Sequence, residues 1–108
     1  MSQQVKTITL NGNLNASTLE EFRHNINQVL DGGAKIVLVD CQNVTFMDSS
    51  GLGALVLAFK SLKEVNIRMV LCSINEQVRI LFELTSMDNV FEIFPSQAEF
   101  NQVLLSSH

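Results

Sequence analysis

Apolar and polar positions follow two alternating periods in the first part of the chain. Residues 5–10 (VKTITL) alternate at period two and are rich in β-branched side chains, which predicts a strand that ends at the Asn11-Gly12 turn. A helical period follows and stops at Gly32-Gly33; its apolar positions are Leu19, Phe22, Ile26, Val29 and Leu30. The continuous apolar run at 36–39 (IVLV) is typical of a central parallel strand that is buried on both faces.

The second part of the chain repeats this alternation. The pattern predicts a helix at about 50–63, a strand at 67–72, a further helix, a short edge strand at 90–93 and a last helix. Three of the predicted helices are opened by a serine with a glutamate three residues later, which is the spacing of a capping box. The pairs are Ser17 with Glu20, Ser73 with Glu76, and Ser96 with Glu99.

This order of elements predicts an α/β fold. Strands that alternate with helices form a mostly parallel sheet, here of about four strands, with right-handed crossovers and with helices packed against it. The length fits a single domain, 1–108. Because partners of such folds meet the loops at the carboxyl ends of the strands, we expect the functional residues in the loops at 11–17, 41–49 and 73–75.

Composition and charge narrow the classes of partner. The chain is 46% hydrophobic and 17% charged, so disorder is not expected, and its net charge of −4 argues against nucleic acid and against anionic membranes. The N-terminus has no pattern of a targeting signal, and the longest apolar stretch without charge, 49–59, is shorter than the ~20 residues of a membrane span. We therefore expect a cytoplasmic protein without direct membrane insertion.

Residue patterns typical of enzymes and of metal or cofactor sites are not found. Cys41 and Cys72 lie far apart without CxxC spacing, so we expect reduced, buried thiols at strand ends and no zinc site or disulfide. The two histidines, His24 within a predicted helix and His108 at the end of the sequence, offer no evident general base for a serine nucleophile. The glycine patterns of nucleotide-binding loops do not match either. We predict no catalytic residue, no metal and no cofactor.

The most informative stretch is FMDSSGLGAL, residues 46–55. It places Gly51 and Gly53, two of only five glycines, in the first turn of a predicted helix. There each glycine destabilises the helix by up to about 1 kcal/mol relative to alanine. Bare backbone at these two positions would let another chain, or a bulky group on Ser50, approach closely. The two glycines therefore favour a functional role for this turn.

The hydroxyl of Ser50 is the candidate reactive group of this stretch. With Asp48 or Ser49 at the N-cap, Ser50 falls in the first turn, beside the unpaired amides and the positive end of the helix dipole. A hydroxyl in that place is an N-cap, a nucleophile or an acceptor of a phosphoryl group.

Helical spacing separates two faces on the helix predicted at 50–63. The wider core face is formed by Leu52, Leu55, Val56, Phe59 and Leu62. A second face, of Ser50, Ala54, Leu57 and Ser61, is small and mildly apolar. This second face either packs under a loop, is plain surface, or is a docking strip that begins at the Ser50 hydroxyl.

At these residues the sequence closely resembles the STAS family, and within it the small bacterial anti-sigma factor antagonists. Residues 11–18 (NGNLNAST) are similar to the G-x-L-D-x-x-T segment of the family. Residues 36–40 (IVLVD) and 44–53 (VTFMDSSGLG) resemble its most specific signature, and the resemblance spans nearly the whole chain. It implies a single STAS-like domain.

The resemblance also implies a regulator that acts by partner switching. In the family, the second serine of the D-S-S-G motif is phosphorylated by an anti-sigma factor that is itself a serine kinase, and a PP2C-type phosphatase resets the switch. The unmodified antagonist binds the kinase and so frees the sigma factor. Transferred to this chain, Ser50 is the phosphoacceptor and Asp40 ties the loop to the strand end. The implied partner-binding residues are Asp48, Ser49, Gly51, Leu52, Gly53, Ala54, Leu57, and Asn13 and Asn15, which stand where the family usually has acidic residues.

Three further expectations accompany this interpretation. Because dipole and free amides of a helix N-terminus favour an anion, the fold should tolerate a phosphate on Ser50, which would block docking directly by charge and bulk. The alternative function is a non-switching STAS accessory or structural subunit of a larger complex, such as a lipid transporter. Many family members have an extra strand before the one at 5–10; without it, an edge remains that pairs with a second copy in a homodimer or is covered in another way.

Overall fold

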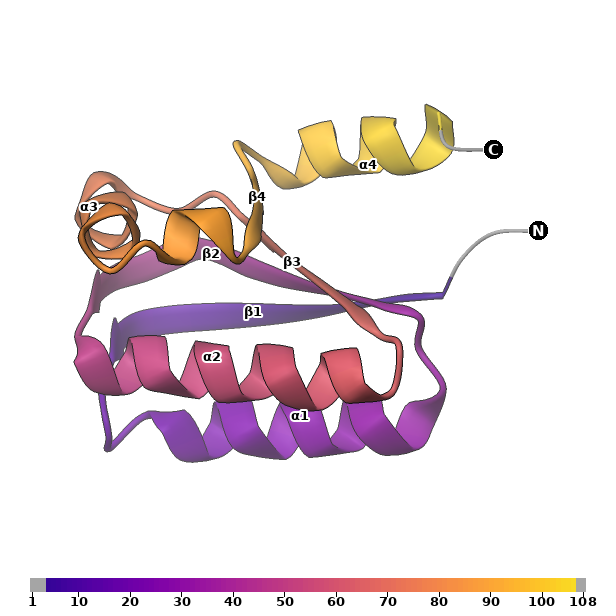
Figure 1. Ribbon diagram of the computed structural model, residues 1–108, viewed down its shortest axis with the longest axis horizontal. Coiled ribbons are helices and arrows are strands. Elements are labelled where there is room, and N and C mark those ends of the chain that lie inside the picture. Colours follow the sequence, from indigo (N-terminus) through magenta and orange to yellow (C-terminus); the bar gives the residue numbers. More distant parts are fainter. Residues whose placement is uncertain (1–3, 107–108) are drawn as a thin grey trace.

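The computed structural model, which describes residues 4–106, contains four parallel strands that lie side by side in the order of the chain, β1-β2-β3-β4 (Figure 1). The α/β prediction, with about four strands and alternating helices, is confirmed. The elements are β1 (Val5–Leu14), α1 (Leu19–Gly32), β2 (Ile36–Met47), α2 (Ser49–Glu64), β3 (Arg68–Cys72), α3 (Glu76–Leu84), the 3₁₀ helix η1 (Met87–Asn89), β4 (Glu92–Phe94) and α4 (Gln97–Ser106).

Helices cover both faces of the sheet, and the two faces are unequal. Figure 1 shows α1 and α2 on one side and α4 on the opposite side. The larger core lies under α1, α2 and α3 and includes Val37 and Val39 of β2. The smaller core contains Ile36 and Leu38 of the same strand, with Phe100 of α4. Alternate residues of the run 36–39 thus enter opposite cores, as expected for a strand buried on both faces.

β1 and β2 are longer than the sequence predicted. β1 continues through Asn11 and Gly12 to Leu14, and β2 continues to Met47, so that most of the predicted loops 11–17 and 41–49 are extended strand. The predicted turn at Asn11-Gly12 is therefore wrong. The pairing of β1 with β2 shifts register twice, between Thr9 and Asn11 and between Gly12 and Asn13. Gly12, between these shifts, adopts a left-handed φ of 69°.

The ends of the helices agree with the sequence only in part. Gly33 ends α1 in the left-handed conformation, as predicted, and the Ser96 hydroxyl accepts a hydrogen bond from the backbone N–H of Glu99 at 3.1 Å. The capping boxes predicted at Ser17 and Ser73 are wrong. The Ser17 hydroxyl instead donates to Asn15 Oδ1 at 2.7 Å within the preceding turn, and α3 is capped by Asn75, whose Oδ1 accepts from the Val78 N–H at 2.9 Å.

Both cysteines are free and buried. Cys41 belongs to the larger core and Cys72 to the smaller one, so their side chains lie on opposite faces of the sheet and are not placed for a disulfide. The prediction of reduced, buried thiols is thus confirmed, although Cys41 lies within β2 and only Cys72 ends its strand. Burial raises the pKa of the Cys41 thiol to about 12.

The sheet has an uncovered edge at β1. Within residues 4–106, β1 is hydrogen-bonded to β2 alone.

No helix of this described part has both the length and the apolar character that a membrane span needs.

Candidate functional site

Asp48 joins the end of β2 to the start of α2 and caps the helix. Its Oδ1 accepts hydrogen bonds from the backbone N–H of Ser50 at 2.9 Å and of Gly51 at 3.1 Å. Its own N–H donates to the carbonyl of Leu14 at 3.3 Å, which ties the cap to the end of β1. Of the two N-cap candidates offered by the sequence, the structure selects Asp48.

Ser49 and Ser50 are exposed in the first turn of α2. Ser50 is an exposed residue, and among the described residues its hydroxyl has no hydrogen-bond partner. Nothing in the described fold seals it from an approaching macromolecule. Ser50 is therefore placed as a modification site requires.

Gly51 is buried, and its neighbours belong to this chain. A Cβ at this position would lie 2.6 Å from the carbonyl oxygen of Leu14 and 2.9 Å from the Met47 Cγ. The sequence suggested that a partner, or a group on Ser50, would approach Gly51. In the structure the end of β1 makes this close approach instead. At Gly53 a Cβ would meet nothing within 4 Å, so this second glycine does leave open space above the helix.

Two amides at the start of α3 hold the segment that leads to Ser50. Gln77 bonds both backbone groups of Met47: its Oε1 accepts from the N–H at 2.8 Å and its Nε2 donates to the carbonyl at 2.9 Å. Asn75 donates through Nδ2 to the carbonyl of Val44 at 3.0 Å. Sequence reasoning missed both residues, because isolated amides in the first turn of a helix carry no signal of a distant contact.

The side chains of the predicted residues Asp40, Asn13 and Asn15 all accept hydrogen bonds. Asp40 Oδ1 accepts from the backbone N–H of Gln42 at 2.9 Å, just beyond the regular part of β2. Asn13 Oδ1 accepts from the Thr45 hydroxyl at 2.9 Å, across the paired ends of β1 and β2. Asn15 Oδ1 accepts from the N–H and the hydroxyl of the residue two positions on. Asp40 and Asn15 thus support backbone within two positions of themselves, whereas Asn13 links the ends of β1 and β2 through a side chain.

A hollow of about 630 Å³ opens beside Ser50. It is lined by Ser49, Ser50 and Gly53 of α2, by Leu19 and Arg23 of α1, and by Thr85 and Met87 beyond α3, among others. A second hollow of about 210 Å³ lies between α1 and α2 and shares Arg23, Ala54 and Leu57 with the first. Together they form one groove, here called the α1–α2 groove, which begins at Ser50.

The second face predicted for this helix follows the α1–α2 groove. Ser50, Ala54, Leu57 and Ser61 all line it. Leu57 is 63% exposed at its rim, which is unusual for a large apolar side chain, whereas Ala54 and Leu52 are buried in its floor. On the core face, Leu52, Leu55 and Leu62 are buried as predicted, together with Ala58, while Val56 and Phe59 are only partly buried.

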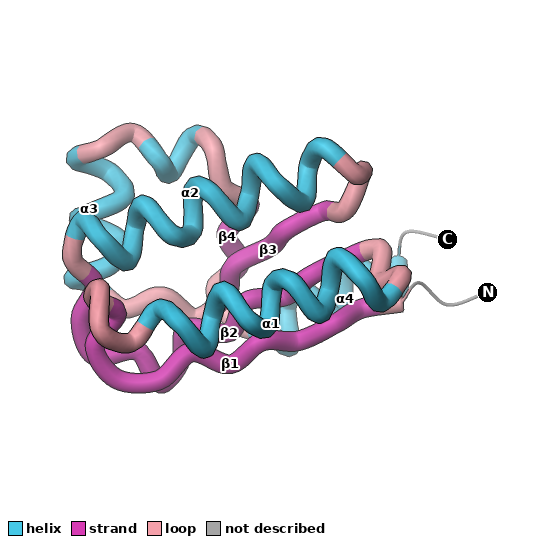
Figure 2. Tube along the Cα trace, turned by 90° about the horizontal axis from the view of Figure 1, so that it is seen from below, coloured by secondary structure: helices cyan, strands magenta, loops and turns pink. Residues whose placement is uncertain are grey.

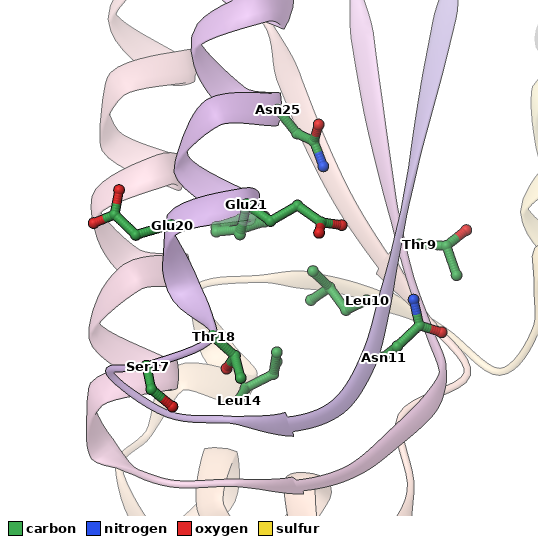
Figure 3. Close-up of a pocket in the computed structure, with 10 residues that line it drawn as sticks. Thr9, Leu10, Asn11, Leu14, Ser17, Thr18, Glu20, Glu21 and Asn25 are labelled. Carbon is green, nitrogen blue, oxygen red and sulfur yellow. The ribbon is translucent and has the colours of Figure 1, made fainter.

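A third hollow, of about 400 Å³, lies between β1 and α1 (Figure 3). Glu21 and Asn25 of α1 point toward β1 in this view, and Ser17 and Thr18 lie at its lower end. None of the predicted phosphoacceptor and partner-binding residues lines it, although Ser17 and Glu20, the pair named as a capping box, do. Among the described residues, no three His, Cys, Asp or Glu side chains are grouped as metal ligands would be.

Comparison with known proteins gives a consistent result. The STAS domain model matches residues 2–100. An anti-sigma-B factor antagonist of Listeria monocytogenes is 36% identical over 93 residues, which are 83% of this chain and 79% of that protein.

Solved structures of SpoIIAA, an anti-sigma factor antagonist, have the same fold. The unphosphorylated form aligns with a TM-score of 0.74 at 20% identity, over 100% of this chain and 94% of the other. The phosphorylated form of SpoIIAA, a cell fate determinant of Bacillus, aligns with a TM-score of 0.71 at 21% identity, over 94% and 93%.

Proposed function

We propose, from the premise that this chain belongs to the STAS domain family, that it is an anti-sigma factor antagonist that acts by partner switching. Unphosphorylated, it binds an anti-sigma factor that is a serine kinase. The kinase transfers the γ-phosphoryl group of ATP to the Ser50 oxygen; the hydroxyl proton and ADP leave, and the modified antagonist is released. A PP2C-type phosphatase hydrolyses the phosphoserine and restores binding. The chain is a substrate in this cycle and not an enzyme, and it acts in the cytoplasm.

The observation that carries this proposal is the exposed Ser50 hydroxyl at the mouth of the α1–α2 groove. A kinase needs an accessible acceptor oxygen, and a docked partner needs a surface beside it. Both requirements are met within one turn of α2. The relatives support the same role, because the Listeria protein is named an anti-sigma-B factor antagonist and SpoIIAA has been solved with and without a phosphate.

The predicted partner-binding residues have different roles in the partner surface that we propose. Ser49, Gly53 and Leu57 line the open groove, so they are the residues that a partner would contact. Asp48 and Gly51 act from beneath, since the first caps the helix and the second packs on Leu14. Leu52 and Ala54 form the buried floor.

Asn13 and Asn15, the other predicted partner-binding residues, belong to the region where β1 and β2 end, outside the lining of the α1–α2 groove. Asn13 is exposed there and Asn15 is half-buried. Phe46, which pairs with Asn13 in the strand register, is 48% exposed although it is large and apolar. We propose that this side of the molecule contributes to recognition of the cognate kinase.

The decisive experiment is phosphorylation by the anti-sigma kinases of the same organism. Each is incubated with the chain and ATP, and the product is mapped by mass spectrometry. We expect one phosphate, which disappears in Ser50→Ala and persists in the matched variant Ser49→Ala. A phosphate that remains in Ser50→Ala would contradict the assignment of the acceptor. Binding without any phosphate, with every kinase, would favour a non-switching accessory subunit.

A further inference from the structure

The first turn of α2 has little hydrogen-bonding capacity left for a phosphate. The N–H groups of Ser50 and Gly51 already donate to the Asp48 carboxylate, and that of Leu52 donates to the Asp48 carbonyl at 3.0 Å. A helix N-terminus usually attracts anions because such groups are free. The amides of Ser50, Gly51 and Leu52 are therefore not free, in contrast to the free amides assumed from the sequence. A phosphate on Ser50 would also lie close to the negative charge of Asp48.

Arg23 is the one charged side chain that lines the hollow beside Ser50, within the part of the chain that the structure describes. It comes from α1, which runs along α2 (Figures 1 and 2). Side chains on a helix lean toward its N-terminus. Arg23 follows this rule, because its Nη1 lies 3.4 Å from the Glu20 Oε1, one turn earlier. The guanidinium is thus directed to the end of α1 that lies beside the Ser50 turn.

The present partner of Arg23 holds it weakly. Both side chains are well exposed, at 58% for Arg23 and 86% for Glu20, and the single contact of 3.4 Å is long for a charge-assisted hydrogen bond. A phosphoserine carries a charge of about −1.5 to −2 and three acceptor oxygens. A guanidinium binds such a group through two parallel hydrogen bonds. Arg23 would therefore exchange Glu20 for the phosphate.

We propose that Arg23 is the internal receptor for the phosphate of Ser50, a role that rests on the proposed function. In the phosphorylated protein, the guanidinium leaves Glu20 and bonds the phosphate across the hollow between α1 and α2. The bridge covers the hollow between Gly53 and Leu57, where the kinase docks in the unmodified protein. Phosphorylation thus closes the docking surface with a contact from α1, without a change of fold.

The test measures the second ionisation of the phosphoserine. Phosphoserine is inserted at position 50 during translation, so that no kinase is needed, and the ³¹P shift is titrated in the intact chain, in Arg23→Gln and in Lys60→Gln. Lys60 is an exposed cation on α2 outside the lining of the hollow, so the second variant controls for net charge. We expect Arg23→Gln to raise the phosphoserine pKa by roughly 0.5 unit or more, because a bound cation favours the dianion. Arg23→Lys should restore part of the shift.

Equal pKa values in Arg23→Gln and Lys60→Gln would overturn the proposal. So would an amide spectrum showing that the phosphoserine protein is unfolded, since the receptor requires a phosphate that the fold accepts. These outcomes are independent of the proposed function, which is decided by whether a kinase modifies Ser50. If no kinase phosphorylates the chain, but Arg23→Gln still raises the pKa of the inserted phosphoserine, the proposed function is refuted and the proposed phosphate receptor stands.

Discussion

At the scale of single residues, Gly51 and Gly53 stand two positions apart and have opposite surroundings. The backbone at Gly51 touches Leu14, whereas Gly53 faces the open groove. The same residue type therefore serves packing inside the chain at one position and leaves access from outside at the other. Local sequence does not distinguish these two uses.

This difference predicts opposite effects of the same substitution. Gly51→Ala should lower the free energy of unfolding by about 1–3 kcal/mol, because the new Cβ meets the backbone oxygen of Leu14, which cannot turn aside. Gly53→Ala is the matched control and should raise it by up to about 1 kcal/mol through helix propensity. Urea unfolding of both variants measures the two effects. Equal effects of the same sign would contradict the packing at Gly51.

Cys41 predicts a pH dependence of stability. Burial raises the pKa of its thiol from 9.0 to about 12 in the folded chain. Above pH 9 the unfolded chain loses this proton first, so the folded state holds more protons and stability must fall as pH rises from 9 toward 12. The expected slope is about 1.4 kcal/mol per pH unit for this one group. Cys41→Ala should flatten the slope, which urea unfolding at pH 8 to 11 will show.

At the scale of elements, α3 fixes the segment that delivers Ser50 to the surface. β3 pairs with β2 only as far as Asp40, and beyond that point Gln77 bonds both backbone groups of Met47. The site is therefore built by three elements, since β2 carries the segment, α2 presents the serine and α3 holds the junction. A rigid junction keeps the acceptor in one position for a kinase.

Loss of this clamp, that is, of the two hydrogen bonds between Gln77 and Met47, should lower the stability of the chain and loosen the backbone that leads to Ser50. Gln77→Ala leaves the partly buried N–H and carbonyl of Met47 without their partners, which should lower the free energy of unfolding by about 1–3 kcal/mol. Amide exchange at 47–51 should become faster in the same variant. Glu83→Gln is the control on the same helix and should change stability by less than about 1 kcal/mol, because it breaks only an exposed ion pair with Arg79. A Gln77 variant as slow in exchange as the unaltered chain would argue against the clamp.

The exposed face of α2 predicts where the partner binds. Leu57→Ala should weaken binding of the cognate kinase about tenfold or more, because a large apolar side chain at a docked rim loses its buried contacts. Stability should change little, since Leu57 is 63% exposed in the free chain. Leu84→Ala is the control, because Leu84 is 80% exposed at the end of α3 and does not line the groove. Calorimetric titration compares both, and equal losses would refute the proposed surface.

At the scale of the whole molecule, the helices α1 and α2 act as a single layer on one face of the sheet (Figure 2). They share a buried core and form the α1–α2 groove at their outer side. Because this layer shares a closely packed core with the sheet, a charge added at its surface is not expected to reorganise it.

This packing predicts that phosphorylation acts locally. Amide chemical shifts of the chain with serine and with phosphoserine at position 50 should differ at 41–60 and at the start of α1, where Arg23 lies, and should coincide elsewhere. Shift changes in β3, β4 or α4 would instead indicate refolding as the mechanism.

The exposed edge of β1 is the place where a second copy of the chain could add a strand to the sheet. Its regular part is short, because two register shifts follow Thr9 and the edge then bends with Gly12. Irregular edges hinder pairing with another strand. A homodimer through this edge, which the sequence left open, would therefore have to pair along residues 5–9, the regular part of the strand.

The sequence by itself determined the order of strands and helices, the parallel α/β class and the position of Ser50 in the first turn of a helix. These properties depend on hydrophobic periods and on residues within one helical turn of each other, which local patterns record.

Tertiary structure alone decided the length of β1 and β2, the contact of Gly51 with Leu14, the clamp by Gln77 and the position of Arg23 beside Ser50. Each of these joins segments that are many residues apart in the chain. Such contacts depend on strand register and on how the crossovers place α1, α2 and α3 over the sheet, and a sequence pattern confined to one segment does not encode them.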